Sequence, residues 1–216
     1  MANSAERRSE GSNKELERII FFSDAIFAIA MTLLVVSITV LQIPANLVAQ
    51  ELPNRLRELL PNLFSYVISF LVIFSYWTVH HSMFSTIRAY DRGLMWMNGL
   101  FLMFVAFLPF PTALLGEYGD QLLVVAIYAG SVAITRLVLS VIWWYASSNY
   151  RLIDSEGLHP ALIRAHHIHG VVITLMFVLS IGIAFYSVSA AKWSWILLTA
   201  GNFIFLGIFR RRHVED

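Results

Sequence analysis

Six long apolar runs constrain the fold of this chain more than any other feature. They cover about residues 19–43, 59–79, 94–115, 122–146, 168–189 and 193–209. A helix needs about 20 mostly apolar residues to cross about 30 Å of hydrocarbon. Hydrophobic residues make up 58% of the 216 residues and charged residues only 13%, whereas soluble domains carry roughly a quarter charged residues. The sequence therefore predicts an all-α, polytopic membrane protein, in which residues 1–216 form a single domain of six transmembrane helices.

The positions of lysine and arginine predict the orientation of this bundle. With both termini in the cytoplasm, 11 of the 15 basic residues lie on the inner side of the membrane, 3 lie on the outer side, and Arg136 lies inside a span. Such an excess of positive charge is typical of cytoplasmic segments. The first 17 residues are polar and charged, so we expect no signal peptide. In segment 44–61, leucines lie among charged and amide residues, which predicts a short interfacial helix or turn on the outer side.

Several classes of function are disfavoured by what the sequence lacks. There is no cysteine for a disulfide, a thiolate metal site or thiol catalysis, and the net charge of +1 gives no footprint for nucleic acid. Phosphate-binding loops, nucleophile elbows and nearby acid–base pairs are missing, so we expect neither an enzyme nor a cofactor. His166, His167 and His169, near Asp154 and Glu156, do not match a zinc pattern and are expected to be solvated loop residues.

Two ionisable residues lie inside predicted spans. Such groups are costly in a bilayer, so each is a functional hypothesis. Asp24 lies in the first span, where the alternative to a functional role is a paired carboxylate that locks helices together. We expect Arg136 in the fourth span to snorkel or to pair with a neighbouring helix, because a voltage sensor needs several arginines in register.

The first span also carries a narrow apolar stripe. At about 100° per residue, this stripe contains Phe22, Ile29, Leu33, Val36 and Val40. Thr32 flanks the stripe, and Asp24 lies on the far side of the helix. On a lone membrane helix such a stripe is expected to contact lipid or a neighbouring helix. A role in a pore therefore needs further support.

That support comes from a set of motifs in the first half of the chain. The first is Arg18-x-x-x-Phe22-Ser23-Asp24, continued by residues 25–34. Further motifs are Tyr76-Trp77-x-x-His80-His81-x-x-Phe84, Tyr90-Asp91, Trp96-x-Asn98 and the run 108–116. Together they resemble the transmembrane-protein-175 family of potassium channels. The resemblance is close over the first three spans, and the last three agree in hydropathy and number.

This resemblance implies an assembly and a pore. A chain with one six-helix repeat is expected to form a homotetramer in a bacterial cell membrane, with the first helix of each copy lining a central path for potassium ions. The constriction of the family corresponds to Ile29, and the next hydrophobic layers correspond to Leu33 and Val36. Thr32 corresponds to a position beside the pathway. Apart from further copies of itself, potassium ions and the lipid bilayer, no partner is implied.

The pore chemistry that follows is unusual for a potassium channel. The Thr-Val-Gly-Tyr-Gly filter is absent, and the stripe holds no ring of acidic residues. A constriction of Ile29, Leu33 and Val36 would gate by dewetting and would favour potassium, which holds its water less tightly than sodium does. We therefore expect a leak-like potassium channel.

The motif residues are then expected to form a structural network that holds the first helix at its tilt. Asp24 and Ser23 would face the second and third helices, where either His80 or His81 joins the network. Its predicted members are Arg18, Phe22, Ser23, Asp24, Trp77, His80, His81 and Asn98. The alternatives are a proton-coupled secondary transporter that uses Asp24 and a histidine, and a membrane scaffold without transport.

Overall fold

The computed structural model describes residues 2–36, 38, 43–153 and 160–212, and side chains at 15–36, 38, 43–153, 163–199 and 201. Every regular element in these residues is helical, which confirms the predicted all-α class. The α-helices are α1 (Ala2–Val36), α2 (Val48–Glu58), α3 (Leu60–Thr86), α4 (Arg92–Phe107), α5 (Pro109–Tyr118), α6 (Leu122–Ser147), α7 (Pro160–Ala184) and α8 (Val188–Arg212). A single turn of 3-10 helix, η1 (Ser148–Tyr150), follows α6.

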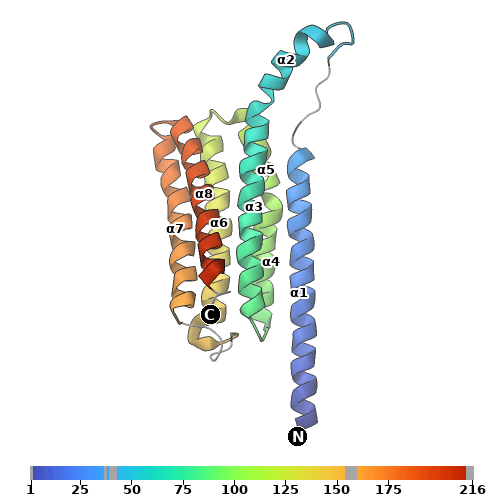
Figure 1. The fold of residues 1–216 in the computed structure, drawn as a ribbon, viewed down its shortest axis with the longest axis vertical. Coiled ribbons are helices and arrows are strands. Elements are labelled where there is room, and N and C mark those ends of the chain that lie inside the picture. The colour runs from blue at the N-terminus through green and yellow to red at the C-terminus, as the bar shows by residue number, and fades with distance from the viewer. Residues whose placement is uncertain (1, 37, 39–42, 154–159, 213–216) are drawn as a thin grey trace.

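The long helices stand side by side and alternate in direction (Figure 1). Helix α1 lies at one side of the bundle against α3 and α4, and α7 and α8 lie at the other side against α6. Helix α2 stands away from the bundle beyond the end of α1. The start of α1 and the end of α8 point toward the same end of the molecule. This arrangement leaves α1 with neighbours on one side only.

Among the residues whose side chains are described, five helical segments are long and apolar enough to cross a membrane. They are Glu15–Val36, Leu60–Thr86, Arg92–Tyr118, Leu122–Tyr150 and Ile163–Ala184. They correspond to the first five predicted spans. The sixth predicted span, 193–209, lies within α8, and most of its side chains lie outside the described residues.

Some span boundaries differ from the predicted ones. Helix α1 begins at Ala2 and ends at Val36, and Ile43 is not helical, so the first helix ends earlier than the predicted span 19–43. Val40 of the stripe lies outside the described residues. Helix α7 ends at Ala184 rather than 189, because Ser187 already caps α8 by accepting the amide of Ala190 at 3.2 Å.

Proline divides the third span into α4 and α5. Pro109 has no amide hydrogen, so the helical ladder cannot continue through it. The amide of Leu108 donates to the carbonyl of Val105 at 3.2 Å, three residues back, and the next helix begins at Pro109. The helix is therefore interrupted at Leu108, and α4 and α5 together still form one apolar segment, Arg92–Tyr118.

The predicted short helix between the first two spans is present as α2. Arg55 pairs with Glu51 at 3.8 Å and with Glu58 at 3.1 Å along its surface. Leu52 and Leu56 are exposed, and none of its residues is buried. Such a helix, with one polar face and one apolar face, is typical of the membrane interface.

Candidate pore face and polar network

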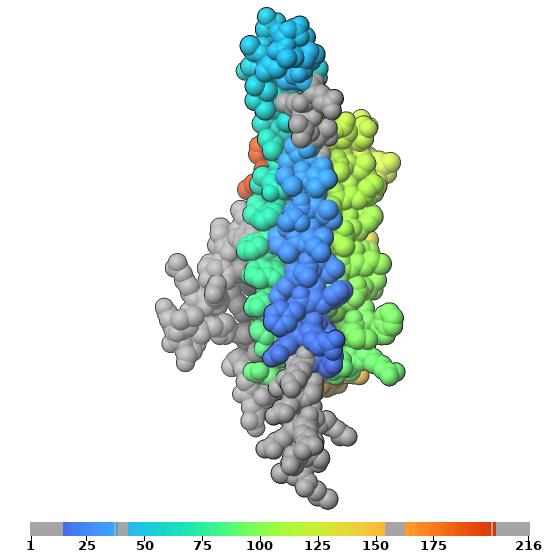
Figure 2. All heavy atoms as spheres, turned by 90° about the vertical axis from the view of Figure 1, so that its right-hand side faces the viewer, coloured from blue at the N-terminus to red at the C-terminus, as the bar shows by residue number. Residues whose placement is uncertain are grey.

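Helix α1 presents its apolar stripe away from its own bundle. Figure 2 shows α1 lying between α3 and α4–α5 with its outer side uncovered. On that side the exposed fractions are 55% for Ile29, 46% for Leu33 and 73% for Val36, while Phe27 and Leu34 on the opposite side are fully buried. The stripe deduced from helical spacing is thus an open apolar face in the single chain.

The open face has a layered geometry. At 1.5 Å of rise per residue, Ile29 and Leu33 lie about 6 Å apart along the axis, and Val36 lies about 4.5 Å further. Phe22 is also exposed, closer to the start of α1. The Thr32 hydroxyl is exposed and donates to the carbonyl of Ile29 at 2.9 Å. Its hydrogen is thereby satisfied within the helix, and its oxygen keeps capacity to accept a hydrogen bond.

Asp24 is half-buried and faces α3. The indole nitrogen of Trp77 donates to Asp24 Oδ1 at 2.9 Å. The Trp77 ring stacks between Phe74 and His81, with centroid distances of 5.6 Å and 5.5 Å. A charge-assisted hydrogen bond of this kind partly compensates a carboxylate that has left water. His81 therefore supports the donor rather than bonding Asp24 itself.

Ser23, Asn98 and His80 form a second chain of hydrogen bonds, from α1 through α4 to α3. Asn98 Nδ2 donates to Ser23 Oγ at 3.0 Å, and His80 Nε2 lies 3.0 Å from Asn98 Oδ1. Because an amide oxygen only accepts, the imidazole proton must sit on His80 Nε2. Ser23 also donates to the carbonyl of Ile19 at 2.8 Å. All three linked side chains are buried, and His80 stacks on Phe84 at 4.1 Å.

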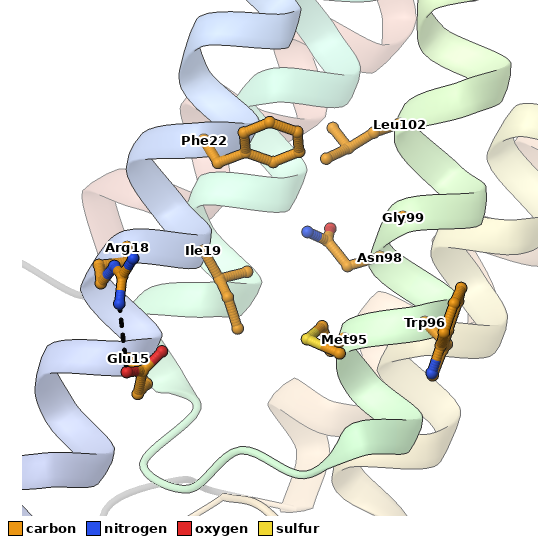
Figure 3. A pocket seen from close by; sticks show the side chains of 9 residues that line it. All are labelled: Glu15, Arg18, Ile19, Phe22, Met95, Trp96, Asn98, Gly99 and Leu102. Carbon is orange, nitrogen blue, oxygen red and sulfur yellow. Dashed lines mark hydrogen bonds and ion pairs between the residues drawn. The ribbon is translucent and has the colours of Figure 1, made fainter.

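Arg18 does not bond Asp24. Its guanidinium pairs with Glu15 at 3.3 Å, and both side chains are exposed. Figure 3 shows that pair at the edge of a groove between α1 and α4, into which Asn98 reaches and across which Phe22 and Leu102 point toward each other. The groove has a volume of about 460 Å³. It brings together motif residues that the sequence had placed on two separate spans.

The histidines after the fourth span lie on a helix, so their prediction as loop residues is wrong. Helix α7 begins at Pro160, which places His166, His167 and His169 against α6. His167 Nε2 lies 3.1 Å from Ser147 Oγ, and His169 Nδ1 lies 3.2 Å from a guanidinium nitrogen of Arg136. Arg136 thus pairs with a neighbouring helix, which was one of the two predictions for this residue; the other was snorkelling to the membrane surface. Asp154 and Glu156 lie outside the described residues. The side chains that are described contain no cluster suited to a metal ion.

Sequence reasoning missed a chain of buried hydroxyl groups between α3, α5 and α6. Thr112 Oγ1 donates to Ser69 Oγ at 2.8 Å, and Ser69 lies 3.0 Å from the hydroxyl of Tyr128. Serine, threonine and tyrosine are common in membrane helices and carry no charge, so the sequence held no signal for their pairing. Cross-helix hydrogen bonds of this kind hold helices together in a bilayer.

A second missed cluster lies at the end of the bundle where α4 begins. Asp91 caps α4 by accepting the amide of Leu94 at 2.8 Å, and it also accepts from Tyr145 at 2.7 Å and Arg151 at 3.1 Å. Partial burial would raise the pKa of Asp91, but these three hydrogen bonds together with the charge of Arg151 hold it below its ordinary value. The carboxylate therefore fastens the α3–α4 loop to the end of α6.

The fold and this geometry define a class: a polytopic, all-helical membrane protein whose first helix is tied to its bundle by polar contacts and leaves an apolar face open. Residues 18–109 match the pattern of a protein family that is described as "Endosomal/lysosomal potassium channel TMEM175". A potassium channel of Streptomyces collinus is 37% identical over 177 residues, covering 80% of this chain and 84% of that protein. The chain belongs to the TMEM175 family. Because this is a family of ion channels, the protein is not an enzyme.

Other relatives place the chain within the family. A potassium channel of Chamaesiphon minutus is 36% identical, with coverage of 66% of this chain and 71% of that protein. The crystal structure of a lysosomal potassium-selective channel TMEM175 homolog from Chamaesiphon minutus superposes with a TM-score of 0.78 at 30% identity, over 88% of this chain and 97% of that one. The endosomal/lysosomal proton channel TMEM175 of Danio rerio is 23% identical, and the match covers only 29% of that protein.

Proposed function

We propose that this protein is a potassium-selective, leak-like cation channel whose constriction is formed by the apolar stripe of α1. The observation that carries the proposal is the open face of α1: Ile29, Leu33 and Val36, which the family resemblance assigns to the constriction, are exposed in a membrane-spanning segment. The bacterial relatives of similar length are named potassium channels, which supports potassium as the permeant ion.

The assembly in this proposal is a homotetramer with α1 of each copy at the central axis. Residues 1–216 form one domain with six spans, the sixth within α8, and both termini lie in the cytoplasm of a bacterial cell. The start of α1 and the end of α8 point toward the same end of the molecule, which is compatible with both termini on one side of the membrane (Figure 1). The excess of basic residues at the inner segments supports their cytoplasmic location.

Selectivity in this pore follows from the cost of removing water. The side chains of Ile29, Leu33 and Val36 offer no oxygen that could replace the hydration shell of an ion, so a permeating ion must be squeezed through partly hydrated or lose water. Potassium loses water more easily than sodium does, so the constriction favours potassium to a moderate degree. Thr32 would supply a hydroxyl oxygen beside the pathway. Ile29 is proposed as the narrowest layer.

The polar network sets the position of α1 in the proposed channel. The contacts of Asp24 with Trp77, and of Ser23 with Asn98, join α1 to α3 and α4 on the side away from the stripe. Buried polar groups in a bilayer are costly unless paired, so each contact favours one placement of the helix. The network thereby directs Ile29 toward the axis.

A proton-coupled transporter is the second function predicted from the sequence. It would use Asp24 and a histidine as a relay. In the described residues, Asp24 bonds Trp77 and His80 bonds Asn98, and no hydrogen bond joins Asp24 to a histidine. This geometry favours the channel, in which those side chains are structural.

Flux into liposomes tests the proposal. The full chain is reconstituted in vesicles, and potassium, sodium and caesium fluxes down their gradients are compared with proton movement recorded by an internal pH dye. The channel predicts uncoupled flux that is faster for potassium than for sodium. Stoichiometric proton movement that vanishes without potassium would instead indicate a transporter, and the absence of flux would indicate a scaffold. A mass measurement in detergent checks the tetramer.

A further inference from the structure

Arg136 is a buried cation in the middle of α6. Its side chain is only 2% exposed, although it lies inside the span Leu122–Tyr150. One guanidinium nitrogen, Nη2, lies 3.2 Å from His169 Nδ1 on α7. The other, Nη1, has no hydrogen-bond partner among the described residues. Because burial of an arginine charge is costly without compensation, this unpaired donor requires an explanation.

The spans supply no carboxylate for this cation. Along the five described spans and α8, the sequence contains acidic residues only at Glu15, Glu17, Asp24 and Glu117. None of them lies on α6, α7 or α8. Asp24 accepts from Trp77 on α3, and Glu15 pairs with Arg18. The countercharge of Arg136 therefore does not come from an acidic side chain of these segments.

The groups around Arg136 are donors or neutral rather than anions. Tyr76 donates its hydroxyl proton to the carbonyl of Val132 at 2.7 Å, so it is not a phenolate. His169 accepts at Nδ1, so its proton lies on Nε2. The positive charge of Arg136 also acts on His166. This part of the bundle thus has a positive potential that no described side chain neutralises.

Helices α6 and α7 pack closely beside the guanidinium. Gly170 lies where α7 approaches α6, and a Cβ at that position would collide with the hydroxyl of Ser140 and lie 3.4 Å from Arg136 Nη2. Ser140 donates to the backbone carbonyl of Arg136 at 3.0 Å. A glycine at this point lets the α7 backbone come close to α6 without displacing the Ser140 hydroxyl.

We infer that Arg136 binds a small monovalent anion of the halide class at Nη1, inside the bundle and apart from the open face of α1. A halide accepts hydrogen bonds, donates none and supplies one negative charge, which matches a site that offers donors and one uncompensated positive charge. The donor is buried where α6 meets α7, which favours a compact monatomic anion over a larger oxyanion or a lipid headgroup. The anion would act as a fixed structural ligand and would not permeate.

Thermal unfolding of the full chain in detergent tests this site. Tryptophan fluorescence is recorded at constant ionic strength while potassium gluconate is replaced by chloride, bromide or iodide. We expect the midpoint to rise by about 3–5 °C for each tenfold increase in halide above half-saturation, because a ligand that binds only the folded state stabilises it logarithmically. The Arg136→Met variant should lose this rise, whereas Arg92→Met, which removes an exposed arginine at the start of α4, should keep it. An equal halide effect in Arg136→Met and in the unchanged protein would overturn the inference.

A direct measurement decides the matter even if Arg136→Met fails to fold. Crystals of the unchanged protein grown in bromide should show an anomalous peak within hydrogen-bond distance of Arg136 Nη1. A water molecule at that position, with no anomalous signal at saturating bromide, would overturn the proposal.

Discussion

Asn98 offers the sharpest test of the polar network, because its amide joins α1 to α3 through α4. Asn98→Ala removes the donor to Ser23 Oγ and the acceptor for His80 Nε2, each at 3.0 Å. The His80 N–H would be left buried without an acceptor, which costs about 1–3 kcal/mol, and the lost bond to Ser23 costs about 1 kcal/mol. We expect a total loss of about 3 kcal/mol. For a chain of this length that loss lowers the midpoint of thermal unfolding by about 6–12 °C.

The assay is a double-mutant cycle in detergent. Ser23→Ala alone should cost about 1 kcal/mol, and adding it to Asn98→Ala should cost less than the sum, because both variants remove the same bond. Ser75→Ala is the matched control, since its buried hydroxyl donates to the carbonyl of Val72 in its own helix at 2.8 Å and shares no partner with Asn98. Additive effects of Ser23→Ala and Asn98→Ala, within about 0.3 kcal/mol, would refute the network.

Three further variants test other parts of the structure. Asp91→Asn should lower stability at pH 7. Because the pKa of Asp91 is lowered in the folded protein, its contribution to folding stability is complete above the ordinary aspartate pKa of about 4 and is lost at lower pH. The variant should therefore also flatten the fall in stability that unfolding measurements record from pH 5 to 2. An unchanged acid profile would contradict this. Gly116→Ala should destabilise the fold by about 1–3 kcal/mol in thermal unfolding, because a Cβ there would lie 2.9 Å from Asn62 Nδ2 and Ser65 Oγ. A Cβ at Gly130 would meet no neighbouring atom within 4 Å, so Gly130→Ala should instead stabilise α6 by about 0.5–1 kcal/mol. Equal effects of the two glycine variants would argue against the close contact between α3 and α5 at Gly116.

The sequence predicted the helical class and the five spans that the structure shows, and it singled out the motif residues. It could do so because the physical reasons for these features act locally. A membrane span must satisfy its backbone within one helix and must be apolar, so length and composition are sufficient to locate it. The side of α1 that carries Ile29 and Leu33 also follows from helical spacing alone. The family resemblance added the expectation that the stripe beside the motif lines a pore. The sequence of a single helix does not contain this information.

The contacts between helices could not be predicted in the same way. The sequence left open whether His80 or His81 joins the network, because the orientation of α3 is set by packing against α1 and α4. His169 was expected in a loop, since the spacing of apolar residues does not show that α7 starts as early as Pro160. Its pairing with Arg136 depends on the approach of two helices that is visible only in three dimensions.

In the proposed channel the apolar stripe of α1 forms the constriction, and Ile29 is its narrowest layer. Planar bilayer recordings under bi-ionic potassium and sodium conditions would give conductance and permeability ratio for the unchanged protein, for Ile29→Asn, and for Val35→Ala, an exposed residue of α1 that lies off the stripe. If Ile29 forms the constriction, Ile29→Asn raises conductance and brings the potassium-to-sodium permeability ratio toward one, while Val35→Ala changes neither. Unchanged conductance and unchanged selectivity in Ile29→Asn would contradict it.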